Sequence, residues 1–100
     1  MRTLRILLVE DDDDHVFLIR RALADLDDLV VSVEVAADGE QATERLARAR
    51  FEPGGRPDLV LLDLKMPRMD GLELLGRIRA DEATRDLPVV VLTSSERRED

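Results

Sequence analysis

The chain has 100 residues, of which 44% are hydrophobic and 38% are charged, and its formal net charge is −8. This length allows one domain with a single core, and the acidity argues against a general nucleic-acid binder, which needs a basic surface. No apolar run approaches the 18 or so residues of a membrane span, and no signal peptide is visible. The chain also lacks cysteine, which excludes disulfides and thiolate metal sites. We therefore expect a cytoplasmic domain that does not bind nucleic acid or membranes.

The first half of the chain predicts a strand, a helix and a second strand. Residues 4–9 are almost all apolar and read as a strand, and Asp12 or Asp13 can cap the helix that follows. Residues 29–36 alternate between valines and polar residues, which is typical of a strand with one solvent-facing side and therefore of a sheet edge. The helix places apolar residues at helical spacing, namely Val16, Ile19, Leu23 and Leu26.

The second half continues the alternation of helices and strands. Residues 40–50 form a weakly amphipathic helix, and residues 51–57 are a loop rich in glycine and proline. A buried strand ends at Asp63, a helix covers residues 72–80, and a last strand covers residues 88–92. The expected inward residues are Ala42, Leu46 and Ala49 of the first of these helices and Leu72, Leu75 and Ile78 of the second. The alternation predicts an α/β fold with a parallel sheet covered on both faces.

Oxygen-bearing side chains follow three of the four predicted strands. Glu10 and Asp11 follow the first, Asp63 ends the third, and Thr93 and Ser94 follow the last. In open parallel sheets the ligand crevice lies beyond the carboxyl ends of the strands, so these side chains should converge there. Carboxylates that meet in one crevice repel each other, and a hard divalent ion such as Mg²⁺ removes that penalty. The pattern predicts a site where Asp63 acts as a nucleophile in phosphoryl transfer.

Each of these residues also has a simpler interpretation. Asp63 alone could be a loop acid that caps a turn, and Thr93 and Ser94 could cap a following helix. Asp13 and Asp14 fit a solvated helix start better than a metal site, and His15, the single histidine, fits an exposed first-turn residue better than a base. The prediction rests on the coincidence of three strand ends.

Three stretches of the chain resemble the receiver domain of two-component response regulators. They are Val9-Glu10-Asp11-Asp12, the stretch from Leu61 to Leu74 with its Asp63-x-x-Met-Pro-x-Met-Asp-Gly pattern, and Val91-Leu92-Thr93-Ser94. The resemblance covers the whole chain. It implies a CheY-like, doubly wound open parallel sheet of the flavodoxin type, with strand order 2-1-3-4-5.

The resemblance also implies roles for individual residues. Asp63 would accept a phosphoryl group from a sensor histidine kinase, with Mg²⁺ as the cofactor. Asp11 would bind the metal directly, Glu10 through water, and Lys65 through its backbone carbonyl. Thr93 would be the switch hydroxyl, and Ser94 would contact the phosphoryl group. The long loop at residues 51–57 is similar to single-domain receivers that partner phytochrome-type kinases.

The chain departs from the family pattern at its end. The family has five strands and five helices, with a lysine after the fifth strand that pairs with the phosphoryl group. Only four strands are predicted here, and Lys65, the only lysine, occupies a different position. The fourth strand would then be an uncovered edge with an apolar face. We expect residues 1–100 to be an incomplete receiver domain: either part of a longer receiver, or a domain whose missing elements come from another chain. The partners expected are a homodimer or a dimer that exchanges a strand or helix.

Two other functions fit parts of the pattern. A haloacid-dehalogenase-type phosphotransferase also uses a strand-end aspartate with Mg²⁺, and Asp11-Asp12-Asp13 superficially resembles its motif. A receiver that binds partners without phosphorylation would need no phosphoryl-pairing lysine. The first alternative predicts a phosphoryl group on Asp11, and the second predicts none. The favoured reading is a signalling domain rather than an enzyme, apart from its own phosphoryl transfer and autodephosphorylation.

Overall fold

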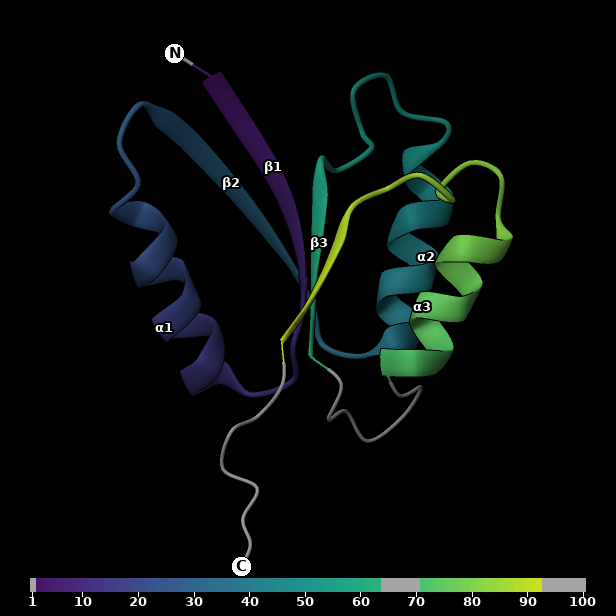
Figure 1. The fold of residues 1–100 in the computed structure, drawn as a ribbon, viewed down its shortest axis with the longest axis horizontal. Coiled ribbons are helices and arrows are strands. Elements are labelled where there is room, and N and C mark those ends of the chain that lie inside the picture. The colour runs from purple at the N-terminus through teal and green to yellow at the C-terminus, as the bar shows by residue number, and fades with distance from the viewer. Residues whose placement is uncertain (1, 64–70, 93–100) are drawn as a thin grey trace, which may run out of the picture.

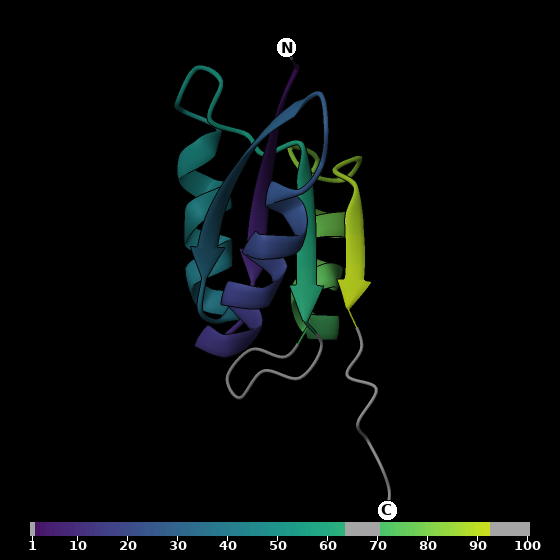
Figure 2. The same cartoon turned by 90° about the vertical axis from the view of Figure 1, so that its left-hand side faces the viewer.

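A computed structural model describes residues 2–63 and 71–92 of the chain. The sheet in these ranges has four parallel strands in the order β2-β1-β3-β4. Its strands are β1 (Arg2–Val9), β2 (Leu29–Ala36), β3 (Leu59–Asp63) and β4 (Val89–Leu92). All four strands point the same way, as the arrows in Figure 2 show, so their carboxyl ends share one edge. The predicted α/β fold and strand order are confirmed, and β2 lies at a sheet edge as expected.

Three helices connect the strands and lie on both faces of the sheet (Figure 1). They are α1 (Asp13–Ala24), α2 (Gly39–Ala49) and α3 (Gly71–Ala80). Helix α1 lies on one face alone, and α2 and α3 lie side by side on the other. The crossover from each strand through a helix to the next parallel strand is the arrangement that the alternating sequence predicts.

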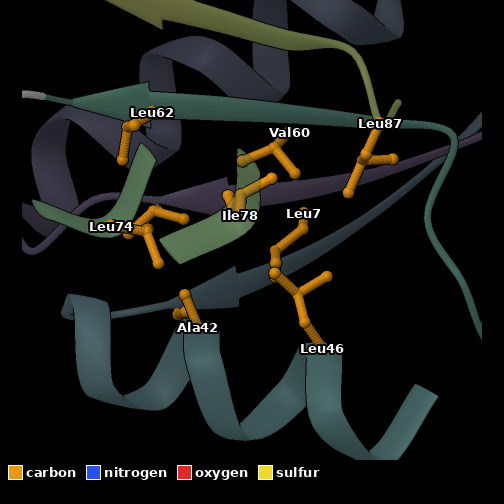
Figure 3. Close-up of a cluster of buried hydrophobic side chains, with 10 residues drawn as sticks. Leu7, Ala42, Leu46, Val60, Leu62, Leu74, Ile78 and Leu87 are labelled. Atoms are coloured by element: carbon orange, nitrogen blue, oxygen red, sulfur yellow. The ribbon is translucent and has the colours of Figure 1, made fainter. Parts of the chain in front are cut away.

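The core lies between the sheet and the α2–α3 layer (Figure 3). Leu7 and Val9 of β1 and Val60 and Leu62 of β3 alternate toward these helices, as the period of a strand requires. From α2 the buried residues include the predicted Ala42, Leu46 and Ala49, with Leu46 only 8% exposed. The helices contribute residues three or four apart, which places them on one helix face.

The opposite face of the sheet is less completely covered. No residue of α1, a helix described over its whole length, is buried, and Phe17 and Leu18 are 58% and 60% exposed. Leu26, expected to face inward, lies beyond the end of α1 and is 45% exposed. Within residues 2–63 and 71–92, β4 is the other edge strand of the sheet, and its Val90 and Val91 are 45% and 38% exposed. That no further strand covers it stays a prediction, because residues 93–100 lie outside the described structure.

The buried face of α3 differs from the predicted one. Leu74 and Ile78 are 1% and 2% exposed and Leu75 packs against the core, but Leu72 is 67% exposed. Leu72 was a plausible inward residue because it also lies three residues before Leu75. The face that meets the sheet is centred on Leu74 and Ile78, four residues apart, and this rotation turns Leu72 toward solvent.

These two leucines provide a matched test of the packing. Replacing Leu74 by alanine should lower the free energy of unfolding by about 2–5 kcal/mol, because the substitution leaves a cavity in the core. Replacing Leu72 by alanine in the same helix should change it by less than about 0.5 kcal/mol. Urea denaturation followed by circular dichroism measures both. Equal losses in the two variants would contradict this orientation of α3.

Candidate functional site

The register of β1 and β3 places two carboxylates side by side at the carboxyl edge of the sheet. Val9 pairs with Leu62 in the parallel ladder, so the next residues, Glu10 and Asp63, follow as neighbours. The backbone N–H of Glu10 donates to the carbonyl oxygen of Ala36 at 2.9 Å, which keeps its backbone attached to β2. Both side chains are therefore held by the central strands of the sheet.

Glu10 and Asp63 are buried charges, only 3% and 8% exposed. Burial raises the pKa of the Glu10 carboxyl above its ordinary value, and the neighbouring Asp63 carboxylate raises it further. The backbone N–H of Asp12 donates to Oε2 of Glu10 at 3.2 Å and opposes this rise in pKa. Two carboxylates so close together are costly without a proton or a cation between them.

The start of α1 is tied to this pair through Asp12. Oδ1 of Asp12 accepts from the backbone N–H groups of Asp14 and His15, at 2.8 and 3.4 Å, so Asp12 is the N-cap of the helix. The sequence left Asp12 and Asp13 open as caps, and the structure selects Asp12. The cap also aims the Asp12 backbone N–H at Glu10.

His15, in the first turn of α1, lies close to the two buried carboxylates of Glu10 and Asp63. Its Nδ1 is 3.4 Å from Oε2 of Glu10, and its Nε2 is 3.9 Å from Oδ2 of Asp12. The negative charges of Asp12 and Glu10 raise the pKa of the imidazole. Half of the side chain is exposed, as expected for a first-turn residue. Its place in the acidic cluster was missed, because the sequence shows no strand-end signal for it.

Glu10, His15 and Asp63 form a donor set that could hold a metal ion. Each residue offers one ligand atom, and these atoms all lie within 4.8 Å of one another. Carboxylate oxygens suit hard divalent cations, and two buried acids supply the negative charge that such an ion neutralises. The chemistry of the pair therefore fits the divalent metal that the sequence predicted.

The other predicted site residues are placed differently or lie outside the described ranges. Asp11 is exposed and does not belong to the three-residue donor set found among residues 2–63 and 71–92. Its predicted role as a direct metal ligand stays a prediction. Lys65, Thr93 and Ser94 fall within residues 64–70 and 93–100, outside the described structure, so their predicted roles also stay predictions.

The sequence matches the family model of the response regulator receiver domain over residues 6–100. The chain belongs to this family. A relative of the receiver domain is the probable methanogenesis regulatory protein FilR2 of Methanothrix harundinacea (strain 6Ac), 46% identical over 92 residues, which are 90% of this chain and 57% of that protein. The chain spans between 25% and 57% of the lengths of the first three curated relatives.

Solved structures support the same assignment. The Mn²⁺-bound form of the response regulator Rcp1 is 34% identical with a TM-score of 0.80, over 94% of this chain and 68% of that one. The phosphorylated cyanobacterial phytochrome response regulator RcpA is 38% identical with a TM-score of 0.75, over 95% of this chain and 68% of that one. The predicted two-component receiver and its likeness to phytochrome-associated response regulators are thus confirmed.

None of the receiver's helices within the described ranges is long and apolar enough to cross a membrane.

The buried carboxylate pair should make the metal-free receiver less stable as the pH rises. The folded state binds a proton at Glu10 more tightly than the unfolded state, so the free energy of unfolding should fall as the pH rises above 4.5, the ordinary value for Glu10. The pKa of His15 is also raised in the folded state, so the free energy of unfolding should fall further as the pH rises above 6.5. Replacing Glu10 by glutamine should remove the first loss and raise the free energy of unfolding at pH 7, because glutamine brings no charge into the buried position.

Urea denaturation between pH 5 and 7.5 in the presence of a chelator measures this effect. The control is Glu44→Gln, which removes an exposed acid from α2 and should leave the pH dependence unchanged. If Glu10→Gln keeps the same pH dependence as the unmodified protein, the two carboxylates do not interact as described.

Proposed function

We propose that Asp63 accepts a phosphoryl group from a sensor histidine kinase, with a divalent cation bound beside it. The observation that carries the proposal is the position of Asp63, a buried carboxylate at the end of β3 next to a second acid, Glu10. Two buried acids at the end of β1 and β3 contribute nothing to apolar packing, and their mutual repulsion must be offset by a proton or a cation. A receiver that transfers a phosphoryl group with a metal ion has a use for both.

The transfer itself needs little from the protein beyond placement. An oxygen of the Asp63 carboxylate forms a bond to phosphorus as the phosphorus–nitrogen bond to the kinase histidine breaks, and the electron pair leaves with the imidazole. The product is an aspartyl phosphate. A cation held by Glu10 and Asp63 would supply positive charge for the phosphoryl oxygens. Hydrolysis of the aspartyl phosphate by water then returns the domain to its starting state, so the domain acts on itself and on no other substrate.

The cation proposed for signalling is Mg²⁺, bound through oxygen ligands. Glu10 and Asp63 are the acids that support it, and Asp11 and the backbone carbonyl of Lys65 complete the proposed ligand set. Thr93 and Ser94 are proposed to contact the phosphoryl oxygens through hydroxyl and N–H groups. These assignments rest on the family resemblance of the matching sequence positions.

The partner proposed for this receiver is a phytochrome-type histidine kinase in the cytoplasm. The similarity to RcpA, described as a phytochrome response regulator, supports this choice. The signal is proposed to pass by protein contact or homodimerisation, with no nucleic acid or membrane as a partner, and the net charge of −8 supports the first exclusion. The proposed homodimer includes one in which a strand or helix is exchanged.

Phosphorylation with a small-molecule donor tests the proposal directly. Incubation with acetyl phosphate and Mg²⁺ should add the mass of one phosphoryl group, and hydroxylamine should remove it, because an acyl phosphate is sensitive to that nucleophile. Asp63→Asn should abolish the mass increase. Asp86→Asn is the matched control, since Asp86 is an exposed acid that pairs with Arg56 before β4 begins, and it should be labelled like the unmodified protein.

The location of the label decides between the functions considered. Intact mass spectrometry followed by peptide mapping should place the phosphoryl group on the peptide with Asp63. A phosphoryl group on Asp11 would contradict the proposal and favour a phosphotransferase. No label under conditions that saturate the site with Mg²⁺ would also contradict it and favour a receiver that works without phosphorylation.

A further inference from the structure

His15 stands where it can bind the same cation as Glu10 and Asp63. It is the only histidine of the chain, and the chain has no cysteine. The ligand atoms of the three residues lie within 4.8 Å of one another. Ligands of one ion are separated by at most about 4.2 Å when each bond is about 2.1 Å long. Because at most one pair of three ligands can lie on opposite sides of an ion, the other separations must be about 3.0–3.6 Å, and side-chain shifts of at most about 2 Å would bring all three onto one ion.

The contacts of the imidazole suit a ligand better than a simple ion-pair partner. Nδ1 lies 3.4 Å from Oε2 of Glu10, and this separation is long for a charge-assisted hydrogen bond. Nε2, on the other side of the ring, faces Oδ2 of Asp12 at 3.9 Å. Histidines that bind metals commonly donate their second ring N–H to a carboxylate, which fixes the orientation of the ring. Oδ2 of Asp12 lies on that side of the ring, but at 3.9 Å it is beyond hydrogen-bond distance and would have to move closer to accept the N–H.

Asp12 also connects the two halves of the site. Its Oδ1 accepts from the backbone N–H of His15, and its own backbone N–H donates to Glu10. One residue thus orients an acid at the end of β1 and a histidine in the first turn of α1. These hydrogen bonds keep the imidazole of His15 next to the Glu10 carboxylate, although no residue of α1 is buried.

We propose that His15 supplies an imidazole nitrogen to the divalent cation at Glu10 and Asp63, and that it strengthens the preference of the site for transition metals such as Ni²⁺ over Mg²⁺. Imidazole is a softer ligand than carboxylate and binds first-row transition metals well, whereas Mg²⁺ strongly prefers oxygen. An all-oxygen site would show this preference more weakly. The inference rests on the metal site of the proposed function but needs no phosphorylation of Asp63.

Pulsed electron paramagnetic resonance of bound Mn²⁺ tests the inference on the whole chain without an affinity tag. The unmodified protein should show a nitrogen coupling from a coordinated imidazole, and with one histidine in the chain the signal can come only from His15. His15→Gln should abolish the coupling. Asp63→Asn should abolish it too, because the cation would lose a buried ligand. Asp14→Asn is the matched control in the first turn of α1, and it should retain the coupling.

Calorimetric titration gives the second readout. His15→Gln should lower the affinity for Ni²⁺ by about tenfold or more and leave the affinity for Mg²⁺ within about twofold. Thermal unfolding in a chelator checks that the half-exposed position tolerates the substitution. Equal losses of affinity for both ions would overturn the proposal.

The spectroscopic outcomes separate this inference from the proposed function. Mn²⁺ that binds without a nitrogen coupling would overturn the role of His15, while acetyl phosphate could still label Asp63. A coupling that persists in Asp63→Asn would also overturn it, because His15 would then bind the ion with surface acids alone. If no Mn²⁺ binds to the unmodified protein, both the role of His15 and the metal site fail.

Discussion

The pairing register of β1 and β3 is the constraint on which the rest of the site depends. Because the strands are parallel and Val9 pairs with Leu62, the next residue of each strand is an acid, and the two acids meet. A shift of one residue would move Leu7 and Val9 off the face that packs against α2 and α3, so the packing of that core favours the same register that brings the carboxylates together. The buried leucines and valines of the central strands therefore maintain an arrangement that is itself unfavourable without a cation or proton.

Much of this fold follows from local patterns in the sequence. The apolar runs of β1 and β3, the alternation in β2 and the Ala42-Leu46-Ala49 face of α2 each predict the observed element. The failures concern which side of a helix is buried. Leu72 and Leu26 lie three residues from the half-buried Leu75 and Leu23. Helix rotation and helix length are set by packing against the sheet, and a one-dimensional pattern does not contain that information.

The site was predictable to the extent that it is built from strand ends. Glu10 and Asp63 follow apolar strands directly, and a parallel sheet brings such ends to one edge. His15 carries no such signal, because it comes six residues after the end of β1 at Val9 and lies in the first turn of a capped helix. Its position depends on the cap formed by Asp12, and the direction of a capped first turn relative to the sheet is a tertiary property.

The start of α1 is attached to the sheet through the same carboxylate that belongs to the site, Glu10. Helices α2 and α3 are anchored by buried residues, whereas α1 contributes none. Its start is instead tied to β1 by the hydrogen bond from Asp12 to Glu10 and by the contact of His15 with the same carboxylate. The electrostatic state of Glu10 therefore bears on the position of α1 as well as on the binding of a cation. Val16, Ile19 and Leu23 of α1 are half-buried, so the contacts at Glu10 add to apolar packing in holding the start of this helix.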